Sequence, residues 1–201
     1  MVKYFRIVAD NERAYPRWHL GEPFDASGEE LDAREFTCAK PYTGAAPSTV
    51  ALKVEGPIFD FNFAAFGMTV LSEKATDFFC SFGTSQAIQA FPVRVQREAG
   101  IWKGAIANFL NTVDCIDRNI ADFDVWADDH EDVLLRGKIR GFGANGIIID
   151  KAKAAGHHLF RLKDWEIGPV ASEDMVDRMQ AVSMSGVTFI QLLDGQQNGA
   201  A

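Results

Sequence analysis

The residues best able to do chemistry lie in the stretch NFLNTVDCIDRNIADFDVWADDHED, residues 108–132, where a cysteine stands between two aspartates. A cysteine acts as a nucleophile or metal ligand through its thiolate, which nearby cations or a helix N-terminus stabilise. Asp114 and Asp117 would do the opposite, because their negative charges raise the pKa of the Cys115 thiol. We therefore expect a buried structural cysteine, with Asp114 and Asp117 accepting hydrogen bonds from backbone amides at a turn.

A glycine motif, GFGANG at residues 141–146, matches the GxGxxG fingerprint of dinucleotide-binding turns. That function requires a strand before the motif and a helix after it, because the amides at the helix N-terminus bind the pyrophosphate. Residues 134–139 can form the strand, but the β-branched run at 147–149 favours a second strand over a helix. The chain after it is also too short for a doubly wound domain. The motif therefore predicts a glycine-rich turn between strands.

Metal binding and nucleophilic catalysis find little support. His157 and His158 are neighbours on a predicted strand, so their side chains point to opposite faces and cannot ligate one ion together. We expect one of them to be buried and the other exposed. His19 and His130 lie in unrelated contexts, and the chain has no Cys-x-x-Cys, His-x-x-x-His or Gly-x-Ser-x-Gly pattern. We predict no catalytic residue, no metal and no cofactor.

Acidic residues crowd the second part of the opening stretch. Between residues 114 and 132, eight carboxylates are opposed by one base, Arg118, while the rest of the chain is nearly neutral. The negative electrostatic field of such a cluster repels nucleic acid and anionic membranes and steers basic proteins toward the surface. Trp126 lies among these acids, as an interface anchor would, although it is also compatible with a tryptophan that closes the core. The predicted interface comprises Asp122, Asp124, Trp126, Asp128, Asp129, Glu131 and Asp132. The alternative is a solvated face that only keeps the protein soluble.

The elements that position these residues follow from hydrophobic periodicity. Alternation of apolar and polar residues predicts strands at 4–9, 49–54, 59–63, 91–96 and 187–192. Residues 108–116 are expected to build core. Ser72 and Ser172 each precede a glutamate, the pattern of a helix N-cap. The first helix should bury Phe78, Phe79 and Phe82 and end near Gly83. Strands and short helices without strict alternation predict an α+β fold with a mixed or mostly antiparallel sheet.

The two capped segments lie one hundred residues apart and align without a gap, VLSEKATDFF at 70–79 and VASEDMVDRM at 170–179. They indicate either a divergent internal duplication or two independent uses of the same capping chemistry. Agreement beyond the cap is sparse, so we favour independent use.

Length and composition predict one packed unit. The chain has 201 residues, of which 47% are hydrophobic, and a domain of this size buries about 70% of its unfolded surface. Three cysteines are too few for a disulfide framework, and no signal peptide or membrane-spanning run is apparent. We expect a cytoplasmic protein. Residues 1–194 should form one domain, with two sub-lobes meeting near residues 97–105, and residues 195–201 should be a disordered tail.

Several segments together resemble a family of bacterial immunity proteins. They are Trp18 in an early loop, NTVDCID at 111–117, GHHLFRL at 156–162, and VASE at 170–173 leading to SGVTF at 185–189. The likeness covers most of residues 1–192 and consists of structural residues, with no catalytic signature. It implies an antidote encoded beside a secreted polymorphic toxin.

The leading hypothesis is therefore an immunity protein that binds a cognate toxin encoded by a neighbouring gene and occludes its active site or locks an inactive form. Nucleic acid and membranes are not expected partners, and a homo-oligomer is left open. One alternative is a small-ligand-binding protein or enzyme with a pocket near Trp18 and Trp102. Another is a scaffold subunit of a secretion assembly.

Overall fold

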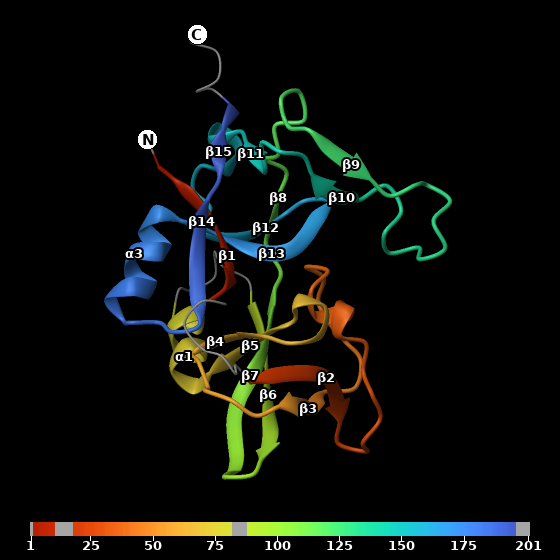
Figure 1. Cartoon of the computed structure of the whole chain (residues 1–201), viewed down its shortest axis with the longest axis vertical. Coiled ribbons are helices and arrows are strands. Elements are labelled where there is room, and N and C mark those ends of the chain that lie inside the picture. The colour runs from red at the N-terminus through yellow and green to blue at the C-terminus, as the bar shows by residue number, and fades with distance from the viewer. Residues whose placement is uncertain (1, 11–17, 82–87, 196–201) are drawn as a thin grey trace.

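The computed structural model describes residues 2–10, 18–81 and 88–195, and its two main β-sheets are stacked along the long axis of the molecule (Figure 1). Strands dominate, and short helices are interspersed among them. Both sheets combine antiparallel and parallel neighbours. The predicted α+β class with mixed sheets is therefore confirmed.

The first sheet has six strands in the order β2-β3-β6-β7-β5-β4. Their bounds are β2 His19–Asp25, β3 Pro47–Val54, β4 Phe61–Phe63, β5 Thr69–Ser72, β6 Ile88–Arg97 and β7 Gly100–Phe109. Only the β3 and β6 pair is parallel. Two 3-10 turns accompany this sheet, η1 at Ala33–Phe36 and η2 at Ala65–Gly67.

The second sheet has five strands in the order β14-β1-β13-β12-β8. They are β14 Val187–Gln191, β1 Tyr4–Ala9, β13 Trp165–Ser172, β12 Leu159–Leu162 and β8 Thr112–Val113. The chain passes from the first sheet to the second after Phe109 at the end of β7, and β1 lies between two strands from the other end of the sequence. Residues 97–105 belong to the β6–β7 hairpin of the six-stranded sheet. The division into domains stays a prediction.

The helices begin where the sequence places their caps. In α1, Glu73–Cys80, the amide of Ala75 donates to Ser72 Oγ, and in α3, Glu173–Ala181, the amide of Met175 donates to Ser172 Oγ. Both helices follow directly from a strand, β5 or β13. Phe79 is buried and Phe78 is half-buried, whereas Phe82 and Gly83 lie outside the described residues.

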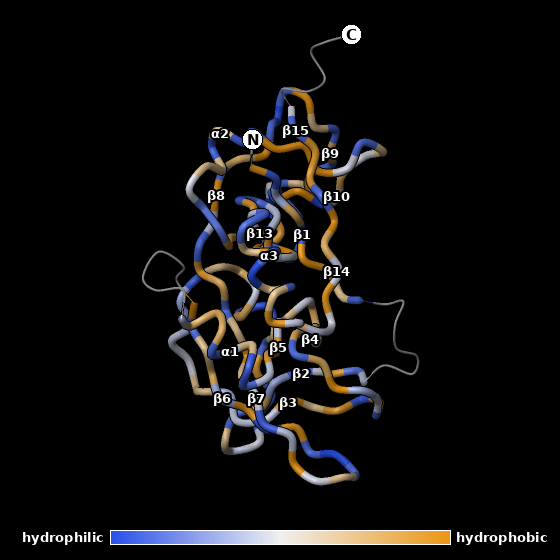
Figure 2. Tube along the Cα trace, turned by 90° about the vertical axis from the view of Figure 1, so that its left-hand side faces the viewer, coloured by the Kyte–Doolittle hydropathy of each residue, from blue (hydrophilic) through white to orange (hydrophobic). Residues whose placement is uncertain are grey.

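A shared core joins the two sheets. Ile7, Phe61, Phe109, Leu159 and Met175 belong to one buried cluster, although they come from both sheets and from α3. Further clusters lie toward either end of the molecule, and hydrophobic segments gather in strands such as β1 and β14 (Figure 2). Because apolar burial drives folding, this shared cluster explains why the stacked sheets form one compact unit.

Two short ribbons complete the fold. β9, Phe123–Val125, pairs with β10, Ile139–Phe142, and β11, Ile148–Ile149, pairs with β15, Leu193–Asp194. The expected strand at 134–139 is wrong, because residues before Ile139 form successive turns in which the amide of Lys138 donates to the carbonyl of Leu135. The glycine-rich turn is confirmed, since Gly146 donates its amide to the carbonyl of Gly143 between β10 and β11. The short α2, Lys151–Ala154, begins only after β11.

None of the described helices has both the length and the apolarity needed to cross a membrane.

Candidate functional site

The predicted interface residues begin just before β9 with Asp122 and continue through β9 and its connection to β10, which loops out from the side of the molecule (Figure 1). We call residues 126–138 the acidic loop. Turns hold it in place, and the amide of Trp126 donates to the carbonyl of Lys138 at 2.8 Å. The exposed members of the predicted set are Asp122, Asp124, Asp128, Asp129 and Glu131, whereas Trp126 and Asp132 are half-buried.

Folding neutralises part of the acidic run with bases that lie far away in the sequence. Asp124 Oδ2 lies 3.3 Å from Arg140 Nη2, and Asp114 Oδ2 lies 3.4 Å from Lys163 Nζ. Asp132 Oδ2 lies 2.6 Å from Arg34 Nη1. Counting charges along the segment finds only Arg118, so it overstates the local negative field.

Four carboxylates of the predicted set keep their charge uncompensated. Asp122, Asp128, Asp129 and Glu131 are exposed and form no ion pair within the part of the chain that the structure describes. Three of them lie on the acidic loop. The negative field available to a partner is therefore concentrated there.

Trp126 forms part of the structure of this loop. Its ring makes an edge contact with the His130 ring at a centroid distance of 4.7 Å, and the Arg140 guanidinium lies 5.6 Å from its centroid. One side of Trp126 lines a hollow of about 350 Å³. The sequence left open whether Trp126 closes the core or anchors an interface. Its position is compatible with both, because it packs against His130 and Arg140 and also faces a concave surface.

That hollow, which we call the Phe66 groove, lies between the acidic loop and the turns η1 and η2. Its apolar lining comes from four parts of the chain and includes Phe66, Trp126, Leu134, Leu135, Trp165 and Ile167. Predicting the groove from sequence would require the contacts between these segments, which local periodicity does not provide. Phe66, Leu134 and Ile167 are exposed members of the lining.

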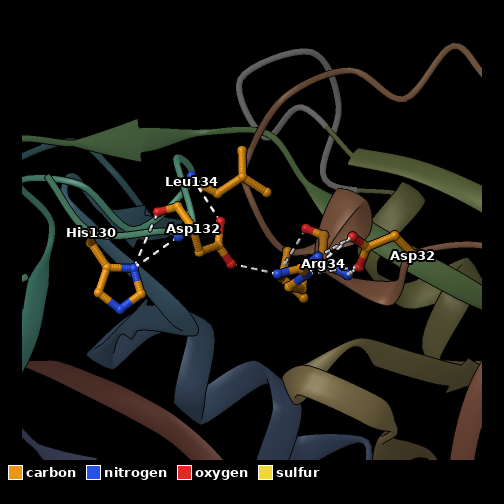
Figure 3. Close-up of polar contacts among 6 residues, drawn as sticks. Asp32, Arg34, His130, Asp132 and Leu134 are labelled. Carbon is orange, nitrogen blue, oxygen red and sulfur yellow. Dashed lines mark hydrogen bonds and ion pairs between the residues drawn. The ribbon is translucent and has the colours of Figure 1, made fainter.

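Arg34 connects the two sides of the groove, as Figure 3 shows. Its Nη1 donates to Asp132 Oδ2, while Nε and Nη2 donate to the Asp32 carboxylate at 3.0 and 2.7 Å. The hydrogen bonds from Arg34 hold the pKa of Asp32 below its ordinary value. The other oxygen of Asp132 accepts from the amide of Leu134 at 2.9 Å, so this aspartate also shapes the loop.

Cys115 is fully buried, as predicted. Burial raises the pKa of its thiol to about 12, with further contributions from Asp114 and Asp150. Asp117 accepts a hydrogen bond from the amide of Asn119 at 3.2 Å, as expected for a turn. The expectation for Asp114 is wrong, because its carboxylate is exposed and lies near Lys163 and Arg118.

The adjacent histidines do not divide into one buried and one exposed, since both are half-buried just before β12. His157 Nδ1 lies 3.4 Å from Asn111 Nδ2, and His158 Nδ1 lies 3.0 Å from Ser172 Oγ. Within residues 2–10, 18–81 and 88–195, no group of three or more His, Cys, Asp or Glu is arranged to hold a metal ion.

The tryptophans of the alternative pocket are mainly structural. Trp18 is buried and packs edge-on against Trp102 at 5.0 Å, and its Nε1 donates to Asn62 Oδ1 at 2.7 Å. Trp18 also borders a hollow of about 400 Å³, whose lining includes His19 and Trp165. Trp102 is not part of that lining.

A comparison with models of known protein families gives a match over most of the chain. The sequence model of the family described as "Immunity protein family (Imm11)" matches residues 18–194. That range includes η1, η2, the acidic residues between 114 and 132, and every described strand except β1. A search of curated proteins finds no match to the chain.

Proposed function

Because the chain belongs to the Imm11 family of immunity proteins, we propose that it binds a cognate bacterial toxin and neutralises it. The match over residues 18–194, most of the chain, carries this proposal. Neutralisation acts through stoichiometric binding, so the protein needs complementary surface and no reaction centre. The toxin acts in the cytosol and is encoded by a neighbouring gene, and the antidote works in the same compartment.

The mechanism we propose is occlusion of the toxin's active site by the acidic surface. Asp128, Asp129 and Glu131 support it, because they are exposed on a protruding loop and no ion pair within the described residues compensates them. Many toxins that attack nucleic acids have basic clefts, to which such a loop is complementary. Electrostatic steering can raise association rate constants toward about 10⁸ M⁻¹s⁻¹ at low salt.

Co-expression tests this function directly. A neighbouring gene whose product stops growth should be tolerated when this protein is present, and the two proteins should co-purify at a fixed stoichiometry. The proposal is wrong if no neighbouring product is neutralised or bound. A melting-temperature shift with nucleotides or metal ions, in the absence of any complex, would instead favour a ligand-binding protein or enzyme.

A further inference from the structure

Phe66 is unusual in both its exposure and its backbone conformation. The residue is 67% exposed, although phenylalanine ordinarily contributes to a core. Its φ of 52° and ψ of 28° lie in the left-handed region, which bulky residues rarely occupy. Neither feature helps the chain to fold. Conformations of this kind persist where the surrounding structure enforces them, and they cluster at binding sites.

The turn around Phe66 holds this conformation. The amide of Gly67 donates to the carbonyl of Ala64 at 3.2 Å, and the amide of Ala64 donates to the carbonyl of Met68 at 2.8 Å. Met68 is fully buried, which fixes one end of the turn in the core. The η2 turn therefore presents the Phe66 ring outward from a fixed base.

The ring lies at the junction of two neighbouring hollows. One is the Phe66 groove of about 350 Å³, and the other, of about 360 Å³, runs past Glu22, Glu30 and Asp32. Arg34 borders both, and its guanidinium carbon lies 5.7 Å from the centre of the Phe66 ring. Together they form one concave surface with an exposed aromatic side chain at its middle.

Carboxylates outnumber bases around this surface. The two linings contain six acids, Glu22, Glu30, Asp32, Asp132, Asp164 and Glu166, and two bases, Arg34 and Lys138. Both bases are already engaged in ion pairs, Arg34 with Asp32 and Lys138 with Glu166. Two of the acids pair with bases just outside the linings, Glu22 with Lys53 and Asp164 with Arg118. With these partners counted, six acids face four bases, so the surface is apolar at its centre and keeps a small net negative charge at its margin.

We propose that the Phe66 groove is the docking site for a segment of the toxin that presents an apolar side chain flanked by lysine or arginine. Phe66 packs against that apolar side chain, and the net negative charge of the margin attracts the flanking bases. The inference rests on the proposed function and deepens it. It places the centre of the interface between η2 and the acidic loop, where a buried aromatic contact can anchor binding while the loop steers the encounter.

Replacing Phe66 with glycine separates binding from folding. Glycine adopts a positive φ without strain, so Phe66→Gly should leave the melting temperature unchanged or higher despite the added chain entropy. Loss of an aromatic anchor should raise the dissociation constant at least about 100-fold. The matched control is Ile101→Ala, since Ile101 is 58% exposed but lies on the β6–β7 hairpin. It should bind like the unaltered protein.

Ile167→Lys provides a second test that does not alter the turn. Ile167 is 57% exposed and lines the groove. A lysine there makes the lining of the groove less apolar and repels a positively charged partner, so it tests both properties of the proposed docking site. Binding should weaken by at least about tenfold, mainly through faster dissociation. Calorimetry with the purified, inactivated product of the neighbouring gene measures the dissociation constant of both variants.

The outcomes distinguish the two proposals. If the unaltered protein binds the toxin, and folded Phe66→Gly and Ile167→Lys bind within about threefold of it, the groove is not the docking site and the immunity function stands. If the unaltered protein neither binds nor neutralises the toxin, both proposals are wrong. Selective loss of binding in the two groove variants, with Ile101→Ala unaffected, supports the groove.

Discussion

Arg34 Nη1 donates a 2.6 Å hydrogen bond to Asp132 Oδ2 and thereby joins two residues 98 positions apart in the sequence. Arg34 belongs to η1 beside the six-stranded sheet, whereas Asp132 belongs to the acidic loop between β9 and β10. The same guanidinium is held by Asp32 through Nε and Nη2. The position of the acidic loop is thus tied to the other half of the molecule by an arginine with two carboxylate partners.

Arg34→Gln should cost stability in a pH-dependent way. Arg34 lowers the pKa of Asp32, so the stabilisation is present above the ordinary aspartate pKa and is lost as pH falls through the lowered value. The partners are more than a third exposed, so solvent screening limits the loss at neutral pH to less than about 1 kcal/mol. Urea unfolding at several pH values should show this difference at pH 7 and its progressive loss in acid, as pH falls through the lowered pKa of Asp32. A difference that persists in strong acid would mean that Arg34 acts through packing alone.

Reversing two unpaired charges on the loop should slow association with the toxin. We expect Asp128→Lys with Asp129→Lys to lower the association rate constant at least about tenfold at low salt, with a smaller effect at high salt. Asp124 and Asp132 are poorer targets because their reversal would also break the ion pairs with Arg140 and Arg34.

The control for that experiment reverses exposed acids elsewhere. Asp77 lies on α1 and Glu98 lies at the β6–β7 turn, so reversing both changes the net charge by the same amount at distant places. Stopped-flow or surface-based kinetics measure both pairs. Equal slowing by the two pairs would assign the effect to overall charge and remove the acidic loop as the steering surface.

Features encoded locally were predictable from the sequence. Ser72 and Ser172 cap helices because a serine side chain reaches amides two or three residues ahead, and this depends on neighbouring residues alone. The burial of Cys115 was predictable because the acids beside it disfavour a thiolate and because residues 108–116 were expected to build core. In contrast, nothing in the acidic segment indicates that Arg34 pairs with Asp132, because only the assembled sheets bring η1 to the loop.

Phe66 illustrates the same limit for the groove. Its sequence setting, Ala-Phe-Gly after an alternating strand, is that of an ordinary aromatic residue near a turn. Its exposure and positive φ depend on how the chain turns back from β4 to β5. Hydrophobicity and spacing would therefore place Phe66 in the core, whereas the fold leaves it exposed.

Loss of the Ser172 cap should destabilise the fold measurably. Ser172→Ala removes the oxygen that accepts from the amide of Met175 and that also lies 3.0 Å from His158 Nδ1, and the expected cost is about 1 kcal/mol. Ser48→Ala in β3, away from any helix start, is the matched control and should change stability by less than about 0.5 kcal/mol. Chemical unfolding measures both. An equal effect at the two positions would argue against a capping contribution.

Cys115 should resist alkylation in the native protein. Its side chain is fully buried, and a thiol with a pKa of about 12 contains little thiolate at pH 8. Cys80 is exposed and should react readily with iodoacetamide under the same conditions. Mass spectrometry of the labelled protein should find Cys115 modified only after unfolding. Rapid native labelling of Cys115 would contradict the structural role assigned to it.

Arg161 should be replaceable by an apolar residue with a gain in stability. It lies in β12 and is fully buried, and burial lowers the pKa of its guanidinium to about 10, so the group is still charged at neutral pH. Nη1 donates to the carbonyl of Glu166 at 2.5 Å, but Nε and Nη2 have no hydrogen-bond partner among the described residues. A buried charge with incomplete hydrogen bonding opposes folding.

Arg161→Met retains much of the side-chain volume and removes the charge, so the free energy of unfolding should rise by about 1 to 2 kcal/mol. Arg161→Ala serves as the comparison, because it removes the charge but leaves a cavity beside the Phe109 ring, which lies 5.8 Å from the guanidinium carbon. The alanine variant should lose about 2 kcal/mol relative to the methionine variant. Urea unfolding at pH 7 gives both values. If methionine destabilises the protein as much as alanine does, the guanidinium contributes net stability through Glu166 and Phe109.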